Sequence, residues 1–365
     1  MTTRYEGPTG WRRAAFSHVE DAVRRLMVVT PPRSRTIRNL AFHRYGKQVR
    51  RILRAAPVEL ELVSRSDLAV GERSTVAELS LVTSAAVAPG DVLSLWWRNS
   101  EQRVASVVRP AGGVMASPGK RSDGRPAADE LVPAESLARR YWTTPLPHRP
   151  SRLTGAPVEE LLREVVDLSG AATDLLTAPR IVPRFFTTSH AAVAGGRTEL
   201  RLQVTRQDGW PERAAAYLSR VEPGEKLRGW VLPHPHRVPP GPGMAIVTGS
   251  GAASVFASLR AGARGVRLLW GLGDKRLAPW AEAELQGWLA SGALAELELA
   301  HSPQRVTDLL RPHSAELRGL IDDGGWVFVS GNEAMGRDVD LIVGDALGEH
   351  RYRASYEAMR CIVST

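Results

Sequence analysis

The sequence predicts a protein of two units, in which an antiparallel β-barrel precedes an α/β unit built on a parallel sheet. Between residues 58 and 232, apolar residues recur at every second position in short runs separated by turn residues, which is typical of antiparallel strands. After residue 241, short apolar runs alternate with helix-like segments, which is typical of a parallel sheet. The length of 365 residues leaves room for two hydrophobic cores. The expected units are a basic lead-in at 1–54, the barrel at 55–240 and the α/β unit at 241–365.

Composition and charge narrow the classes of function. The 48 basic residues exceed the 39 acidic ones by 9, yet no nucleic-acid-binding motif accompanies this excess. We therefore expect an acidic protein partner or a phosphorylated cofactor rather than a nucleic acid. The single cysteine, Cys361, excludes an internal disulfide and a cysteine-based metal cluster. No apolar run approaches the roughly 18 residues of a membrane span, and no signal peptide is present, so we expect a cytoplasmic protein.

The first 54 residues contain one amphipathic segment, 10–29, which ends at Pro31-Pro32 and is followed by an arginine-rich stretch. This lead-in either packs on the barrel as a solvated helical segment or offers a basic docking face to an acidic protein partner.

The barrel strands follow in order. Strands are expected at 58–62, 76–81, 92–97, 199–205 and 227–232, and the third strand begins after the turn Pro89-Gly90-Asp91. A Gly/Pro-rich loop is expected at 109–136, and a helical insert at about 134–178 contains a helix at 158–168. A proline-rich linker at 239–242 then ends the barrel. His234 and His236 lack a third ligand at a fitting spacing, so no metal site is predicted.

The α/β unit opens with an apolar run, 244–247, that meets Thr248-Gly249-Ser250-Gly251. A helix to about residue 263 and a strand at 266–270 follow. Such a turn between a strand and a helix points backbone N–H groups at an anion, although many Gly-Ser-Gly turns are only turns. A later helix carries Trp280 and Trp288 on one face, where they are expected to be core residues.

Three stretches, 183–189, 243–274 and 326–335, stand in an order that resembles the ferredoxin-NADP reductase superfamily. The similarity is to its diflavin branch, which includes cytochrome P450 reductase and the sulfite reductase flavoprotein. It covers residue 55 to the C-terminus, without a flavodoxin domain and with several motif residues replaced. The resemblance implies FAD on the barrel and NADPH or NADH on the α/β unit.

The resemblance also implies roles for residues of the barrel. Arg184 would contact the FAD diphosphate, Phe186 would stack on the isoalloxazine where the family has tyrosine, and Thr187 would stand near flavin N5 in place of serine. The family's pyrophosphate turn, which comes just before a Tyr-Leu pair, corresponds to Arg213, Ala214 and Ala215.

In the α/β unit the resemblance assigns a glycine-rich turn, a 2'-phosphate site and a catalytic strand end. Gly249, Ser250 and Gly251 match the turn. Ser302 matches the 2'-phosphate site, where Pro303 replaces the expected arginine and Arg305 is the candidate substitute. Ser330 stands where the family has a cysteine near nicotinamide C4, and Gly331 follows it. The implied catalytic residues are therefore Thr187 and Ser330.

Two functions remain open. The first is an FAD-dependent NAD(P)H oxidoreductase that passes hydride from nicotinamide to FAD, and then electrons to a flavodoxin, a ferredoxin, an oxygenase or a small substrate. The second is a degenerate member of the family without hydride transfer, which acts as a regulatory or partner-binding subunit or serves another biosynthetic chemistry.

Overall fold

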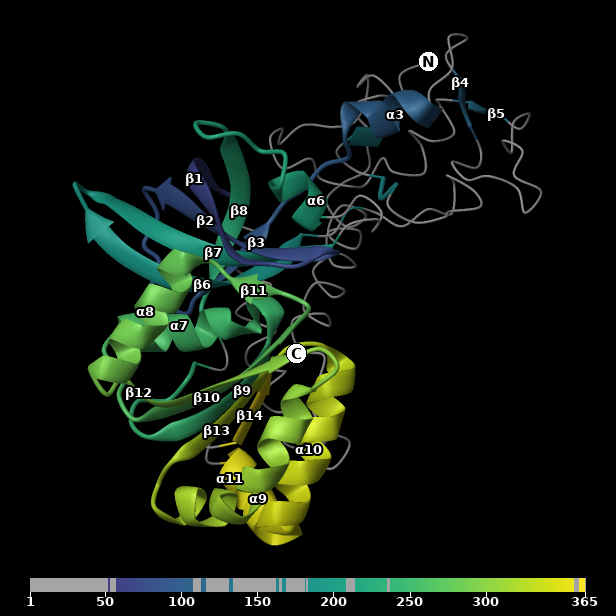
Figure 1. The fold of residues 1–365 in the computed structure, drawn as a ribbon. Coiled ribbons are helices and arrows are strands. Elements are labelled where there is room, and N and C mark those ends of the chain that lie inside the picture. The colour runs from purple at the N-terminus through teal and green to yellow at the C-terminus, as the bar shows by residue number, and fades with distance from the viewer. Residues whose placement is uncertain are drawn as a thin grey trace, which may run out of the picture.

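The structure is a computed structural model in which two β-sheets are joined through a layer of helices (Figure 1). It describes residues 52, 57–107, 113–115, 131–133, 162–163, 166–168, 181, 183–207, 214–234, 237–357 and 361–364. The predicted helix at 10–29 and most of the predicted insert at 134–178 lie outside these residues.

Six antiparallel strands of the first half close into a barrel (Figure 1). They are β1 (Val58–Val70), β2 (Ser74–Thr83), β3 (Val92–Leu95), β6 (Arg184–Ala194), β7 (Arg197–Gln207) and β8 (Lys226–Leu232). Their order is β1-β2-β7-β6-β3-β8, and β8 pairs back onto β1. Leucines at alternate strand positions fill the interior; Leu60 and Leu62 of β1, for example, are fully buried. This is the alternation from which the sequence predicts a barrel.

Five parallel strands form the second sheet, in the order β12-β10-β9-β13-β14. They are β9 (Gly243–Thr248), β10 (Val266–Gly273), β12 (Leu294–His301), β13 (Trp326–Ser330) and β14 (Cys361–Ser364). The helices on one face are η2 (Gly249–Ala252), α7 (Ala253–Arg260) and α8 (Pro279–Ala290). Those on the other face are α9 (Val306–Asp322), α10 (Glu333–Leu347) and α11 (Glu349–Glu357).

The two halves share a hydrophobic core. α7 and α8 lie between the two sheets, and α7 packs against β6 of the barrel (Figure 1). Leu68 and Val76 of the barrel belong to the same buried cluster as Phe256 and Trp270 of the second half. The short strand β11 (Arg276–Leu277) comes from the second half but pairs with the end of β1.

The predicted fold class is confirmed: an antiparallel barrel precedes a parallel α/β sheet. Several predicted details are wrong. β3 ends at Leu95, so Trp97 lies beyond the strand. The predicted loop at 109–136 contains a small antiparallel pair of β4 (Gly113–Met115) and β5 (Leu131–Pro133). Leu162 and Arg163 are helical as predicted, but Val166 forms an isolated bridge. The helix after the glycine turn ends at Arg260 rather than near residue 263.

Two further short helices accompany the barrel, α3 (Glu101–Val107) and α6 (Ala214–Leu218). None of the helices in the described part of the chain combines the length and the apolar character needed to cross a membrane.

Candidate functional site

The candidate site lies at the carboxyl ends of β9 and β13. From β9 the chain moves to β10 and β12 on one side, then returns to add β13 and β14 on the other. The order of the strands therefore reverses between β9 and β13. In open α/β sheets such a reversal leaves a crevice at the carboxyl ends of the strands, where nucleotides bind.

Two glycines let the backbone segments at this point approach each other closely. A Cβ atom added to Gly251 would lie 2.5 Å from the carbonyl oxygen of Ser330, and one added to Gly331 would lie 2.1 Å from Thr248 Oγ1. Real side chains do not tolerate such distances. The structure therefore brings Gly251 together with Ser330 and Gly331, which lie far from it in the sequence, and adds Thr248 to them.

Side chains from both sheets hold the glycine turn in place. Gly249 has a φ of +52°, a conformation that favours glycine. Its carbonyl accepts a 3.1 Å hydrogen bond from the indole nitrogen of Trp270 on β10. Thr205 of the barrel strand β7 donates to Ser250 Oγ at 3.0 Å and accepts from the Ser250 amide at 3.3 Å. The residues expected to bind an anion therefore lie where the barrel meets the parallel sheet.

Sequence reasoning did not identify Thr205 and Trp270 as members of this site. Thr205 reads as an ordinary outward residue of an alternating strand, and Trp270 as an ordinary core residue. Their roles depend on the packing of the two halves, for which the local sequence carries no signal.

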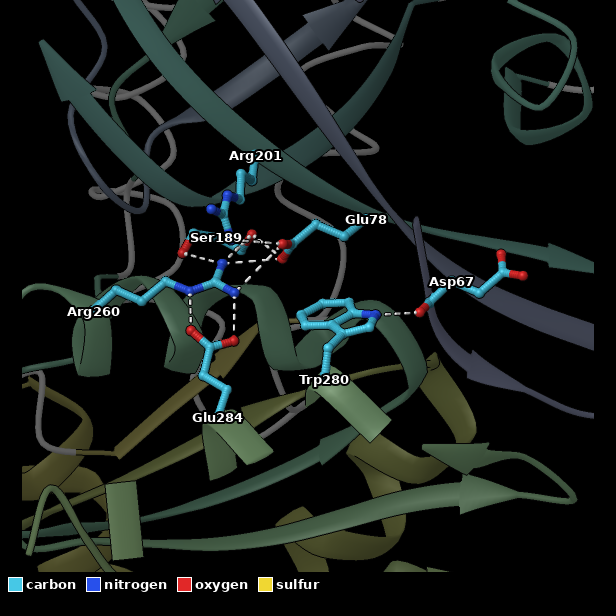
Figure 2. Close-up of polar contacts among 7 residues, drawn as sticks. All are labelled: Asp67, Glu78, Ser189, Arg201, Arg260, Trp280 and Glu284. Carbon is cyan, nitrogen blue, oxygen red and sulfur yellow. Dashed lines mark hydrogen bonds and ion pairs between the residues drawn. The ribbon is translucent and has the colours of Figure 1, made fainter. Parts of the chain in front are cut away.

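A buried charge network fixes the other end of α7 (Figure 2). Arg260, whose side chain is 8% exposed, donates to both carboxylate oxygens of Glu284 on α8, at 2.8 and 2.7 Å. It also lies 3.0 Å from Glu78 of β2, which is 3% exposed. Arg201 and Ser189 of the barrel donate to the same Glu78 carboxylate, at 3.2 and 3.1 Å. α7 is thus held against the barrel at its last residue, as Thr205 holds the turn before it.

Figure 2 also shows a second contact between the halves, in which the Trp280 indole nitrogen donates to the Asp67 carbonyl at 2.8 Å. Trp280 packs against the shared core, as the sequence predicts.

The network shifts the pKa values of two basic groups. Burial alone would lower the pKa of Arg260, but the hydrogen bonds and charges of Glu284 and Glu78 outweigh it and raise that pKa. The pKa of His190, beside the network on β6, is lowered by its burial and by the charges of Arg201 and Arg260. Arg260 therefore stays charged, and His190 is disfavoured as a cation.

The barrel residues of the candidate site lie on β6. Arg184 begins this strand, and Phe186 and Thr187 pair with Leu93 and Val92 of β3. The half-buried Phe186 ring packs against two buried clusters of the barrel. Because successive side chains of a strand alternate, Thr187 lies on the opposite face of β6.

The predicted pyrophosphate turn is only partly described. Ala214 and Ala215 open the five-residue helix α6, whereas Arg213 lies outside the described residues. Ala214 is 2% exposed and packs with Trp97 and Ile181.

The predicted 2'-phosphate residues follow β12, at the edge of the parallel sheet. The Ser302 amide donates to the Gly273 carbonyl at 2.8 Å, and the Arg305 amide donates to Asp308 at 2.8 Å as α9 begins. β10 separates β12 from β9, so this edge is roughly 10 Å from the glycine turn. Arg305 lines a groove of about 510 Å³ in which three aspartates, from α9 and α10, accompany two arginines. This excess of carboxylates gives the groove little attraction for a phosphate.

One group of side chains has the geometry of a metal site. Potential ligand atoms of Glu296, Glu298 and His313 lie within 4.8 Å of one another. His313 Nε2 lies 2.5 Å from Glu298, and Arg267 pairs with Glu296 at 3.7 Å. These ion pairs account for the cluster, and it lies on β12 and α9, away from the glycine turn. Of the two histidines that the sequence singles out, His234 is described and His236 is not.

No protein-family model matches the sequence, and no curated protein sequence matches it. Among solved structures, ferredoxin-NADP+ reductase from Plasmodium falciparum aligns with a TM-score of 0.50 at 9% identity, over 85% of this chain and 96% of that one. A mutant of ferredoxin-NADP+ reductase from the same organism, in complex with 2'P-AMP, gives a TM-score of 0.48 at 9% identity, over 84% of this chain and 95% of that one. At this identity the first likeness shows a shared two-sheet fold and nothing finer. The resemblance to the diflavin branch stays a prediction.

Proposed function

We propose that the chain is an NAD(P)H-dependent flavin oxidoreductase that binds a dinucleotide across the carboxyl ends of β9 and β13. The close approach of Gly251 to Ser330 at the reversal of strand order is the observation that carries this proposal. The glycine turn leads directly into the N-terminus of α7, where the helix dipole favours a phosphate. A ferredoxin-NADP+ reductase from Plasmodium falciparum is among the solved structures of similar fold, which supports the proposal.

The residues fit a nucleotide better than they fit a flavin. At the glycine turn, the missing Cβ atoms of Gly251 and Gly331 let the turn and the end of β13 pack closely together, as the nucleotide prediction requires. On the barrel, Arg184 and Thr187 stand on one strand, β6, as the flavin prediction requires, but the half-buried Phe186 ring packs against the barrel core.

In this proposal Ser330 places its hydroxyl beside the nicotinamide, and the Gly249–Gly251 turn orients the pyrophosphate. Arg184 offers a positive charge to the second cofactor, and Thr187 a hydroxyl. Bound FAD would supply the hydride acceptor. An acidic redox protein or a small substrate would then receive the electrons.

The packing of Phe186 also favours a second candidate function. A ring that stabilises the barrel core is less free to stack on an isoalloxazine, and Thr205 already bonds the Ser250 amide. Both features suit a degenerate family member that keeps the fold without hydride transfer.

The absorbance spectrum of the purified full chain separates these two functions. It is recorded before and after incubation with excess FAD and desalting, then after anaerobic addition of NADPH or NADH. We expect flavin bands that bleach on addition of the reduced nucleotide. A colourless protein that does not retain FAD would instead support the non-redox function.

The Ser330→Ala variant tests the role of the hydroxyl. We expect flavin reduction to slow by roughly tenfold or more, while flavin content is unchanged, because the hydroxyl acts on the reacting nicotinamide rather than on FAD binding. Stopped-flow absorbance measures the rate. Ser314→Ala on α9 is the matched control, and an unaltered rate in Ser330→Ala would remove Ser330 from the catalytic machinery.

A further inference from the structure

An open cavity of about 630 Å³ lies between α7, the linker before β9 and the Pro89-Gly90 turn of the barrel. Its volume falls within the range of 300–1,000 Å³ that is typical of small-molecule sites. The lining residues are Pro89, Gly90, Arg237, Val238, Pro240, Gly241, Pro242, Ser254, Ala257, Ser258, Ala261, Gly262, Ala263, Arg264 and Gly265.

The cavity is distinct from the dinucleotide site. Pro242 directly precedes β9 and Gly265 directly precedes β10, so these lining residues lie at the amino ends of the two parallel strands. Gly251 and Ser330 lie beyond the carboxyl ends. A six-residue strand such as β9 spans about 20 Å, so this end of the cavity is far from the glycine turn.

The walls suit a flat ligand. α7 contributes Ser254, Ala257 and Ser258, and Ala261 directly follows it; these residues share one face because they are spaced by three and four residues. Opposite them the linker contributes glycine and proline. Apart from Arg237 and Val238 of the linker, the side chains of these two walls are small, so a planar body can lie between the helix and the linker.

Two hydroxyls on the helix wall are available to a ligand. Ser254 is 6% exposed and lines the cavity, and no hydrogen bond to its hydroxyl, or to that of Ser258, occurs within the described part of the chain. A hydroxyl that lines a cavity and bonds to no neighbouring group can donate a hydrogen bond to a ligand and accept one from it.

The charge of the lining is positive. Arg237 and Arg264 contribute guanidinium groups, and no carboxylate is among the lining residues. Arg237 is held by an ion pair with Asp91, and Arg264 donates to the Ser291 carbonyl. Each guanidinium has five N–H donors, so these anchors leave others for an anion.

We propose that this cavity binds a small, planar organic anion, with the Ser254 and Ser258 hydroxyls and the two arginines as its polar contacts. The site is independent of the proposed redox function, because it uses none of the residues placed at the glycine turn.

Fluorescence titration of the full chain with 1-anilinonaphthalene-8-sulfonate tests the proposal, because this probe joins a flat naphthalene ring to a sulfonate anion. We expect saturable binding at one site. Ser258→Phe fills the cavity and should abolish the binding, whereas the matched variant Ser314→Phe on α9 should not change it.

Arg264→Gln should weaken binding of the probe by up to about fivefold, as expected for loss of an exposed ion pair, and Arg264→Lys should retain most of the affinity. The uncharged analogue N-phenyl-1-naphthylamine should not distinguish Arg264→Gln from the original chain.

Circular dichroism checks that each variant is folded. If Ser258→Phe does not fold, Ala261→Leu serves as the second cavity-filling variant, since Ala261 is an exposed residue directly after α7. Probe binding that persists in a folded, cavity-filled variant, displacement of the probe by NADPH, or failure of the probe to bind would each overturn the proposal.

Discussion

At the scale of single residues, the candidate site depends on two positions that have no side chain, Gly251 and Gly331. The atom that a Cβ on Gly251 would meet is a backbone oxygen, that of Ser330, which cannot move without displacing β13. A Cβ added to Gly287, within the ordinary helix α8, would instead meet nothing within 4 Å. Replacing Gly251 and replacing Gly287 with alanine should therefore change the stability of the fold in opposite directions.

We expect Gly251→Ala to lower the free energy of unfolding by about 1–3 kcal/mol, because the added methyl group overpacks the contact with β13. Gly287→Ala should raise it by about 0.5–1 kcal/mol, because alanine is the better helix former. Urea denaturation measures both. Equal stabilities of the two variants would show that Gly251 does not approach Ser330 as described.

The charged cluster on β12 and α9 makes stability depend on pH through His313. Burial alone would lower the pKa of this histidine, but the hydrogen bond and charge of Glu298, with the charges of Glu296 and Glu316, outweigh it and raise the pKa. A raised pKa means that the folded state binds the proton more tightly than the unfolded state. The resulting stability is present below the unfolded value near 6.5 and is lost as the pH rises through the folded pKa.

We therefore expect His313→Gln to cost most stability at pH 6 and progressively less towards pH 9. His190, with its lowered pKa, acts in the opposite direction, so the pH profile of a single protein does not isolate His313. Thermal unfolding of His313→Gln and of the original chain across this range gives the required difference. The control is the same substitution at the exposed His301. If the stability lost in His313→Gln does not vary with pH, the ion pair of His313 with Glu298 is contradicted.

At the scale of elements, α7 is fixed at both ends by the barrel, through Thr205 before its first turn and through Arg260 at its last residue. Arg260 is buried between two carboxylates, whereas Arg267 pairs with Glu316 at the surface, where Glu316 is 52% exposed. The two arginines have similar partners and differ in burial.

Replacing Arg260 with methionine should cost about 3 kcal/mol, because Glu78 stays buried after it loses a partner. Replacing Arg267 with glutamine should cost less than about 1 kcal/mol, as for other exposed ion pairs. Adding Glu78→Gln to the Arg260 variant should restore part of the loss, since it removes the uncompensated charge. Similar costs for the two single variants, measured by urea denaturation, would argue against the buried network.

The elements themselves were largely predictable from the sequence. Alternating leucines identify β1 and β2, and the apolar run before Gly249 identifies β9. The two residues of β11 are too few to carry a periodic pattern, and β14 was not predicted either. The contacts that join the halves, such as that of Thr205 with Ser250, depend on tertiary packing and have no local signal. The packing of the Phe186 ring against two clusters of the barrel is likewise tertiary and is not revealed by its sequence neighbours; its expected role at a flavin stays a prediction.

At the scale of the whole molecule, the barrel and the parallel sheet share one buried cluster and one charge network. Leu68 and Val76 of the barrel lie in the same core as Trp270 and Phe328 of the second half. Separating the halves would expose this apolar surface and the charged groups together. The two sheets are therefore expected to unfold as a single cooperative unit.

Hydrogen exchange followed by mass spectrometry checks this expectation. Slowly exchanging peptides from β2 and β7 should give the same free energy of opening as peptides from β9 and β13, because both sheets open only in global unfolding. Arg260→Met should lower both values equally. Two clearly different values in the original chain would mean that the halves open independently.

The strand β11 has a consequence for dividing or recombining the chain. Its two residues, Arg276 and Leu277, pair with Ala69 and Val70 at the end of β1, although they come from the second half of the sequence. A fragment that stops at the proline-rich linker would leave the end of β1 as an open edge next to the uncovered Leu68, a combination that promotes aggregation. Chimaeras made by exchanging the halves at this linker would join a β1 to a β11 from another protein. The two halves of a chimaera must therefore be chosen so that β1 of one pairs with β11 of the other, as well as by the cofactors that they bind.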